Sequence, residues 1–127
     1  MNGIRVKKLS PKAALPTYGS SGAAGADLYA CLDEAITIAP GGNAWIPTGL
    51  ACKKGLAPAN KVGVIDSDYR GPVTVVLYNH GSETQTICHG ERIAQMVITP
   101  VLTPAYEWDE TLSETDRGQG GFGSTGK

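Results

Sequence analysis

The chain has 127 residues, with 11 basic and 12 acidic side chains and a formal net charge of −1. This length favours one domain that buries about two-thirds of its unfolded surface. The near-zero charge argues against a protein that grips nucleic acid through a basic face. Because the sequence contains neither a membrane-length apolar window nor an apolar signal-peptide core near its start, we expect a soluble cytoplasmic protein that contacts no membrane.

Short β-type runs dominate the chain, which contains 17 glycines and 8 prolines spread along its length. In chain order they cover residues 4–9, 26–32, 35–40, 44–51, 62–66, 72–79, 84–90 and 92–101. In the sixth run, Val73, Val75 and Leu77 alternate with the residues between them as in a half-buried strand. Residues 53–60 have some helical character, but their glycine and proline limit it to a turn. The pattern predicts an all-β sandwich, barrel or jelly roll.

The cysteines and histidines do not form a metal-binding or disulfide pattern. Cys31, Cys52 and Cys88 are odd in number, far apart and without a C-x-x-C partner, so we expect reduced thiols. His80 and His89 each follow a predicted strand and precede a glycine, which indicates turn residues.

Two predicted strands carry isolated polar residues. Asp27 lies among small residues in AGADLYA (24–30), where its carboxylate could approach Mg²⁺, through water or directly. Arg92 and Gln95 interrupt the apolar run GERIAQMVI (90–98). Arg92 could clamp a phosphate with two hydrogen bonds or pair with a neighbouring carboxylate, and pairing is the commoner outcome.

The stretch VGVIDSDYRG (62–71) is the densest polar cluster in an apolar setting. If the strand continues through it, Asp66 and Asp68 face one side and Tyr69 the other. A carboxylate at the end of a strand can act as a general base on a nearby water. The residues fit a second interpretation equally well, a tight turn in which Asp66 or Asp68 caps the backbone.

The C-terminal GGFGSTGK (120–127) matches the phosphate-binding pattern G-x-x-x-x-G-K. A phosphate loop of that kind, or a dinucleotide fingerprint, needs a strand before it and a helix after it, and the preceding SETDRGQG is polar and turn-rich. Composition alone therefore favours a disordered glycine-rich tail, which carries Arg117 and Phe122.

Four segments in this order, AGADLYA, NKVGVIDSDYRG, GERIAQMVITP and DRGQGGFGSTG, resemble the first, third, fourth and fifth motifs of the trimeric dUTPase family. The resemblance covers nearly the whole chain. It implies a dUTPase-like jelly roll, or β-clip barrel, over residues 1–112 and a flexible glycine-rich arm over 113–127. It also implies a homotrimer with shared active sites that hydrolyses dUTP to dUMP and pyrophosphate with Mg²⁺.

The resemblance assigns roles to individual residues. Asp66 would activate the water that attacks the α-phosphorus, and Asp27 would serve the magnesium ion through water. Asn60 would bond the uracil edge, Tyr69 would pack on the deoxyribose, and Phe122 would stack on uracil beneath the closed arm. The family pattern places further substrate contacts at Val64, Arg92, Gln95, Arg117, Gly123, Ser124 and Thr125.

One part of the family pattern is missing. Between its first and third motifs the family has a further strand and a P-R-S-G-L-A motif, whereas residues 44–66 read AWIPTGLACKKGLAPANKVGVID, with GLA repeated at the join. We expect the strand and the Arg-Ser pair to be absent, although Thr48 or Lys53 could take over phosphate contacts. Activity should then be reduced or lost, and the alternative is an impaired nucleotide-binding or regulatory protein. The related dCTP deaminases share the fold but match these motifs less well.

Overall fold

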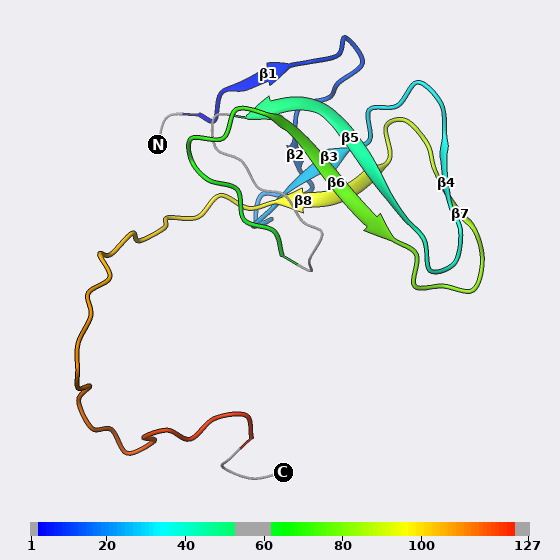
Figure 1. Ribbon diagram of the computed structural model, residues 1–127. Coiled ribbons are helices and arrows are strands. Elements are labelled where there is room, and N and C mark those ends of the chain that lie inside the picture. The colour runs from blue at the N-terminus through cyan, green and yellow to red at the C-terminus, as the bar shows by residue number, and fades with distance from the viewer. Residues whose placement is uncertain (1–2, 53–61, 124–127) are drawn as a thin grey trace.

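The protein is an all-β molecule in the computed structural model, which describes residues 3–52 and 62–123 (Figure 1). Its strands are β1 (Val6–Lys8), β2 (Thr17–Tyr18), β3 (Ala26–Tyr29), β4 (Ile36–Ile38), β5 (Asn43–Cys52), β6 (Pro72–Tyr78), β7 (Gln85–Ile87) and β8 (Arg92–Met96). Within the two described ranges no residue is helical, so no helix there could cross a membrane. The all-β prediction is confirmed, and the expected turn at 53–60 lies outside the described residues.

The strands form three small antiparallel sheets. Their orders are β1-β5-β6, β2-β3-β8 and β4-β7. In Figure 1, β6 crosses in front of β3 and β8, and β4 and β7 extend to one side of this crossing. The molecule is therefore a sandwich of two three-stranded sheets with a two-stranded extension.

The core lies between the two three-stranded sheets. Leu28 and Met96 of one sheet pack with Val73 and Val75 of the other. A second buried cluster contains Ile46, and the partly buried Leu77 packs against both clusters. The alternation expected for the β6 segment is confirmed, because Val73 and Val75 are buried while Tyr78, at the outer end, is exposed.

Strand β5 is regular at its beginning and irregular near its end. Its pairing with β6 runs from Asn43 to Pro47 and then shifts, so that Ala51 rather than the residue two positions earlier lies opposite Pro72. Gly49, at φ 69°, lies inside this irregularity. A Cβ there would come within 2.8 Å of the Cys31 sulfur, so both the backbone angle and the packing require glycine.

Two expectations about the strands differ from the structure. Residues 62–66 form no strand, and the side chains of Val62 and Val64 are exposed, so a strand there would bury little apolar surface to offset its conformational entropy. Strand β2 was not expected, because it is only two residues long and is flanked by Pro16 and Gly19.

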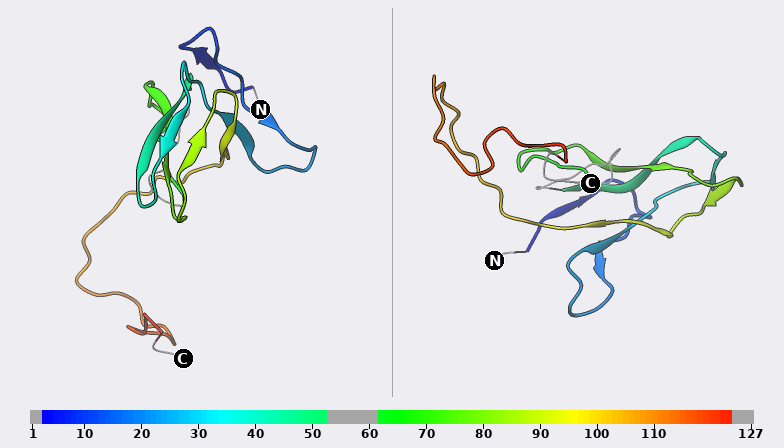
Figure 2. Two further views of the ribbon diagram at one scale, coloured as in Figure 1. Left: turned by 90° about the vertical axis from the view of Figure 1, so that its right-hand side faces the viewer. Right: turned by 90° about the horizontal axis from the view of Figure 1, so that it is seen from below.

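The C-terminal run, residues 99–123, leaves the body after β8. Figure 1 and the left view of Figure 2 show it following its own path away from the sheets. Every residue from 99 to 119 is exposed, and none of 99–123 belongs to a strand or helix. The exposed run thus begins ahead of residue 113, where the sequence places the start of the arm.

Candidate active site

A buried carboxylate anchors the first group of candidate residues. Asp27 on β3 lies directly opposite Gln95 on β8 in the antiparallel ladder. The Gln95 amide donates a 3.0 Å hydrogen bond to Oδ1 of Asp27, and Arg92 Nη1 lies 3.8 Å from Oδ2. The register of two strands thus brings together three residues that the sequence separates by up to 68 positions.

This group has one buried end and one exposed end. The Asp27 side chain is 11% exposed, whereas the Arg92 side chain is 70% exposed. A buried carboxylate requires a compensating charge or hydrogen bonds, and Arg92 and Gln95 supply them. Of the two roles open to Arg92, pairing with a carboxylate is the one observed, and the outer part of its guanidinium still faces solvent.

Gly25 makes room for this arrangement. A Cβ at Gly25 would lie 3.1 Å from Gln95 Cβ and 3.2 Å from Gln95 Oε1. A side chain there would push Gln95 away from Asp27. Gly25 is not among the residues expected from the sequence, and the signal that marks it is a glycine two residues before a lone strand carboxylate.

A turn carries the second group. The Tyr69 N–H donates a 3.2 Å hydrogen bond to the Asp66 carbonyl, which closes a turn over Ser67 and Asp68. The turn interpretation of this stretch is therefore correct, although its closing bond uses the backbone rather than a carboxylate. Asp66 is exposed, and its carboxylate has no hydrogen-bond or ion-pair partner among residues 3–52 and 62–123.

Tyr69 is fixed on the surface by its own neighbours. Its hydroxyl donates a 3.0 Å hydrogen bond to the Pro72 carbonyl, and its ring covers Gly71 so closely that a Cβ there would lie 2.5 Å from Cζ. Tyr69 remains 39% exposed, so the fixed ring can still offer a surface to a ligand.

Thr48 cannot replace the hydroxyl of the missing second motif. It is 1% exposed, and its hydroxyl donates a 2.6 Å hydrogen bond to the Val73 carbonyl in the interior. The suggestion that Thr48 contacts phosphates is therefore wrong. Lys53, the other candidate, lies outside the described residues.

The remaining candidates lie on the C-terminal run or outside the described residues. Arg117 and Phe122 are exposed, and Phe122 has a φ of 51°. Asn60, Ser124 and Thr125 lie outside the described residues. In Figure 1 the described part of the run lies away from the body, so the run and the loop at Asp66 remain separate in this single chain.

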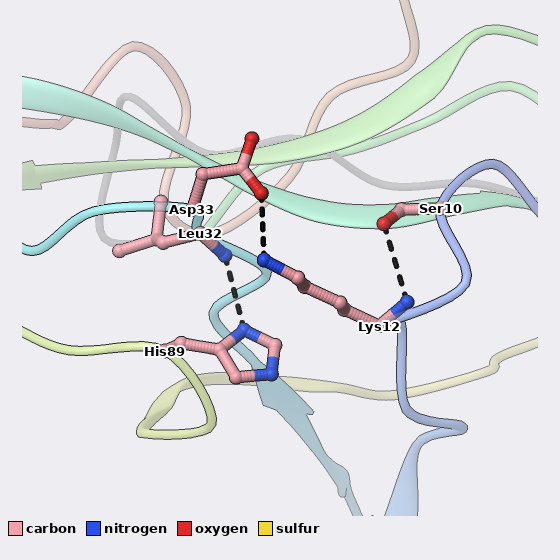
Figure 3. A network of polar contacts seen from close by, with 5 residues as sticks. All are labelled: Ser10, Lys12, Leu32, Asp33 and His89. Carbon is pink, nitrogen blue, oxygen red and sulfur yellow. Dashed lines mark hydrogen bonds and ion pairs between the residues drawn. The ribbon is translucent and has the colours of Figure 1, made fainter.

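The histidines serve local structure. Figure 3 shows His89 Nδ1 accepting a 3.1 Å hydrogen bond from the Leu32 N–H, beside the Lys12–Asp33 ion pair. The His80 ring meets the Tyr78 ring edge-on at a centroid distance of 4.6 Å. Among the described residues, no three His, Cys, Asp or Glu side chains form a group that could hold a metal ion.

Comparison with solved structures identifies the class of protein to which this fold belongs. The Staphylococcus bacteriophage 80alpha dUTPase in complex with dUpNHpp superimposes with a TM-score of 0.87 at 26% identity, with all of both chains covered. A mutant dUTPase of S. aureus phage phi11, studied for its coordination of a structural Mg(II) ion, gives a TM-score of 0.77 at 21% identity over 89% of this chain and 100% of that one. The fold is thus that of the dUTPases.

Sequence comparison establishes the family. The dUTPase family model matches residues 11–126. A deoxyuridine 5'-triphosphate nucleotidohydrolase of Enterobacter sp. (strain 638) is 44% identical, with 100% of this chain and 99% of the relative covered, and one from Roseobacter denitrificans is 48% identical over 88% of this chain and 86% of the relative. This chain belongs to the dUTPase family.

The same comparison reveals a difference in length. The alignment to the Enterobacter protein has 150 positions, 23 more than the 127 residues of this chain. Relatives of this length therefore carry about that many residues without a counterpart here. This difference agrees with the expected absence of a strand and motif.

Proposed function

We propose that this chain hydrolyses dUTP to dUMP and pyrophosphate as a cytoplasmic, magnesium-assisted homotrimer with shared active sites. The observation that carries the proposal is the match of the dUTPase family model across residues 11–126. Relatives named deoxyuridine 5'-triphosphate nucleotidohydrolase over the full chain, and a neighbour bound to dUpNHpp, support the substrate.

Asp66 is the proposed general base. Its exposed carboxylate, at the end of a hydrogen-bonded turn, is available to take a proton from an attacking water. Three residues further along, Tyr69 would offer its fixed ring to the deoxyribose, where the space occupied by the ring would exclude a 2′-hydroxyl. Val64, beside the same turn, and Asn60 would read the uracil.

Asp27 is the proposed contact to magnesium. Both of its oxygens already face partners, Gln95 and Arg92, so the residues present fit an ion that keeps its waters and takes its other ligands from the triphosphate. The ion would neutralise phosphate charge. Gln95 and Arg92 would hold the carboxylate in place, and the exposed end of Arg92 would face a phosphate.

The arm supplies the remaining contacts in this proposal. Arg117, Gly123, Ser124 and Thr125 would contact the phosphates, while Phe122 would stack on uracil. Glycines on both sides of Phe122 let backbone N–H groups approach the nucleotide closely. Closure would also expel water, so that the charged contacts act in a drier site.

Pyrophosphate release from dUTP with Mg²⁺, measured beside UTP and dCTP, tests the proposal. We expect hydrolysis of dUTP alone and a loss of kcat of about 10²- to 10⁴-fold in Asp66→Asn, the usual contribution of a general base. Asp68→Asn is the matched control, because Asp68 is an exposed carboxylate in the same turn, and it should retain activity. Equal hydrolysis of UTP, or equal losses in the two variants, would contradict the assignment.

A second function is favoured by one observation. Thr48 is buried with its hydroxyl bonded to the Val73 carbonyl, so β5 does not supply a phosphate-binding hydroxyl from this position. The chain would then be an impaired dUTPase that binds nucleotide or regulates a partner. Binding of dUpNHpp without pyrophosphate release from dUTP would establish this function in place of the first.

A further inference from the structure

Residues 115–120 of the exposed C-terminal run form a hydrogen-bonded turn. The Gly118 N–H lies 3.0 Å from the Thr115 carbonyl and 3.1 Å from the Thr115 hydroxyl, and it can donate to both. The Gly120 N–H donates to the Arg117 carbonyl at 3.1 Å. Gly118 has a φ of 54°, which glycine adopts at little cost. The turn thus forms from contacts within the run itself.

This turn also fixes the direction of a charged group. Arg117 Nε donates a 2.6 Å hydrogen bond to the Gly120 carbonyl at the end of the turn. A guanidinium carries its donors in a rigid planar fork, so engaging Nε with one acceptor fixes the orientation of the fork and leaves the end formed by its two terminal NH₂ groups available. That end of the fork is the one suited to gripping a phosphate with two hydrogen bonds.

Thr115 supplies the side-chain support for the turn. Its hydroxyl is an additional acceptor for the Gly118 N–H, which otherwise depends on one backbone carbonyl in a solvent-exposed segment. A segment that is ordered before binding loses less conformational entropy when it closes on a ligand. The Thr115 hydroxyl therefore acts on closure without touching the ligand.

We propose that Thr115 is a positioning residue that orders the 115–120 turn and thereby aims the Arg117 guanidinium at the triphosphate. The inference rests on the proposed function, because it takes the arm to close on the nucleotide. Because the turn forms in the chain without nucleotide, Thr115 orders the arm before the ligand binds.

The test compares Thr115→Val, which keeps the shape and removes the hydroxyl, with Thr115→Ser, which keeps the hydroxyl. A net hydrogen bond of ordinary strength corresponds to about a three- to tenfold change in an equilibrium. We expect Thr115→Val to raise KM for dUTP by that factor with kcat little changed, and Thr115→Ser to behave as the parent. Equal KM values for the parent and Thr115→Val would overturn the inference.

A double-mutant cycle with Arg117→Ala separates positioning from a general structural effect. If Thr115 acts through Arg117, Thr115→Val has no further effect once Arg117 is Ala. If the two effects on KM simply multiply, Thr115 does not act through Arg117 and the inference is wrong.

Trypsin cleavage after Arg117 gives a readout independent of turnover. We expect dUpNHpp to protect this bond in the parent and in Thr115→Ser, and about three- to tenfold more analogue to be needed in Thr115→Val. Protection of the parent and Thr115→Val at the same concentration would overturn this inference and leave arm closure standing. No protection and no hydrolysis in the parent would overturn arm closure, and the inference with it.

Discussion

The sandwich body and the C-terminal run both contain large apolar side chains, but the body buries many of them and the run leaves them exposed. Ile46 in the body is 0% exposed, whereas Leu102 in the run is 90% exposed, and Tyr106 and Trp108 are fully exposed. In the body, alternating residues meet an opposing sheet. In the run, Pro100 and Pro104 lack a backbone N–H to donate to a ladder, and no residue of 99–123 belongs to a strand. Apolar content therefore does not determine burial, and the availability of a pairing partner does.

The largest expected difference between the body and the run is in the unfolding free energy lost when Ile46 or Leu102 is truncated. Truncation of a fully buried isoleucine costs about 2–5 kcal/mol, through lost transfer free energy and the cavity that remains. We expect Ile46→Ala to lower the free energy of unfolding by this amount in denaturant titrations. Leu102→Ala, the control from the run, should change it by less than about 0.5 kcal/mol.

A large loss of stability in Leu102→Ala would contradict the contrast between a buried body and an exposed run. It would mean that the run packs against another surface in solution. If the loss depended on protein concentration, that surface would belong to a second copy of the chain.

A smaller effect is expected for the polar contacts of the body. The buried Asn79 side chain donates to the Ile38 carbonyl at 2.8 Å and the Glu83 carbonyl at 2.7 Å, and it accepts from the Gly81 N–H at 2.9 Å. Asn79→Ala would leave these groups without partners, at a cost of about 1–3 kcal/mol in unfolding free energy.

Two controls sharpen this prediction. The side chain of Asn43, on the neighbouring strand β5, is exposed, so Asn43→Ala should change unfolding free energy little. Thr115→Val, in the exposed run, should leave it unchanged even though KM rises. A stability loss in Thr115→Val equal to that of Asn79→Ala would show that the turn in the run belongs to the cooperative unit of the body.

The smallest effect is expected at the exposed Lys12–Asp33 pair, 2.8 Å apart (Figure 3). The hydrogen bond from Lys12 lowers the pKa of Asp33 below its ordinary 3.8, and the same bond raises the pKa of Lys12 above 10.5. The Asp33 contribution is present above pH 3.8 and is lost as pH falls through the lower folded pKa. The Lys12 contribution is present below pH 10.5 and is lost as pH rises through the higher folded pKa.

Stability curves of the parent and Asp33→Asn should therefore run parallel from about pH 5 to about pH 9 and converge below about pH 4. Salt should reduce the small gap between them, because both side chains are exposed. A gap that widens on acidification would contradict the pairing.

The sequence predicts the body well where pattern and pairing agree. The alternation at Val73 and Val75 identifies β6 and its buried face correctly. The same type of pattern at residues 62–66 fails, because Val62 and Val64 are exposed and the segment has no strand partner in the described structure. Periodicity reports which face would be buried if a partner exists, and it does not report whether one does.

The candidate site shows the same limit. The single residues Asp27, Arg92 and Gln95 are visible in the sequence as polar interruptions of apolar strands. Their contact depends on the register between β3 and β8, which follows from pairing across the whole sheet. Gly25 leaves room for the Gln95 side chain, and Thr115 accepts a hydrogen bond within a local turn. Amino-acid composition indicates neither effect.

The length of chain between β8 and the turn at 115–120 has a further consequence. Residues 97–116 could span about 60 Å when extended, at roughly 3.3 Å per residue. A tether of this length keeps its end near the body at an effective concentration of the order of millimolar. In the proposed closure, contacts too weak to bind the turn as a separate peptide would then be sufficient to bring it onto a bound nucleotide, and they would be weak enough to release it again after each turnover.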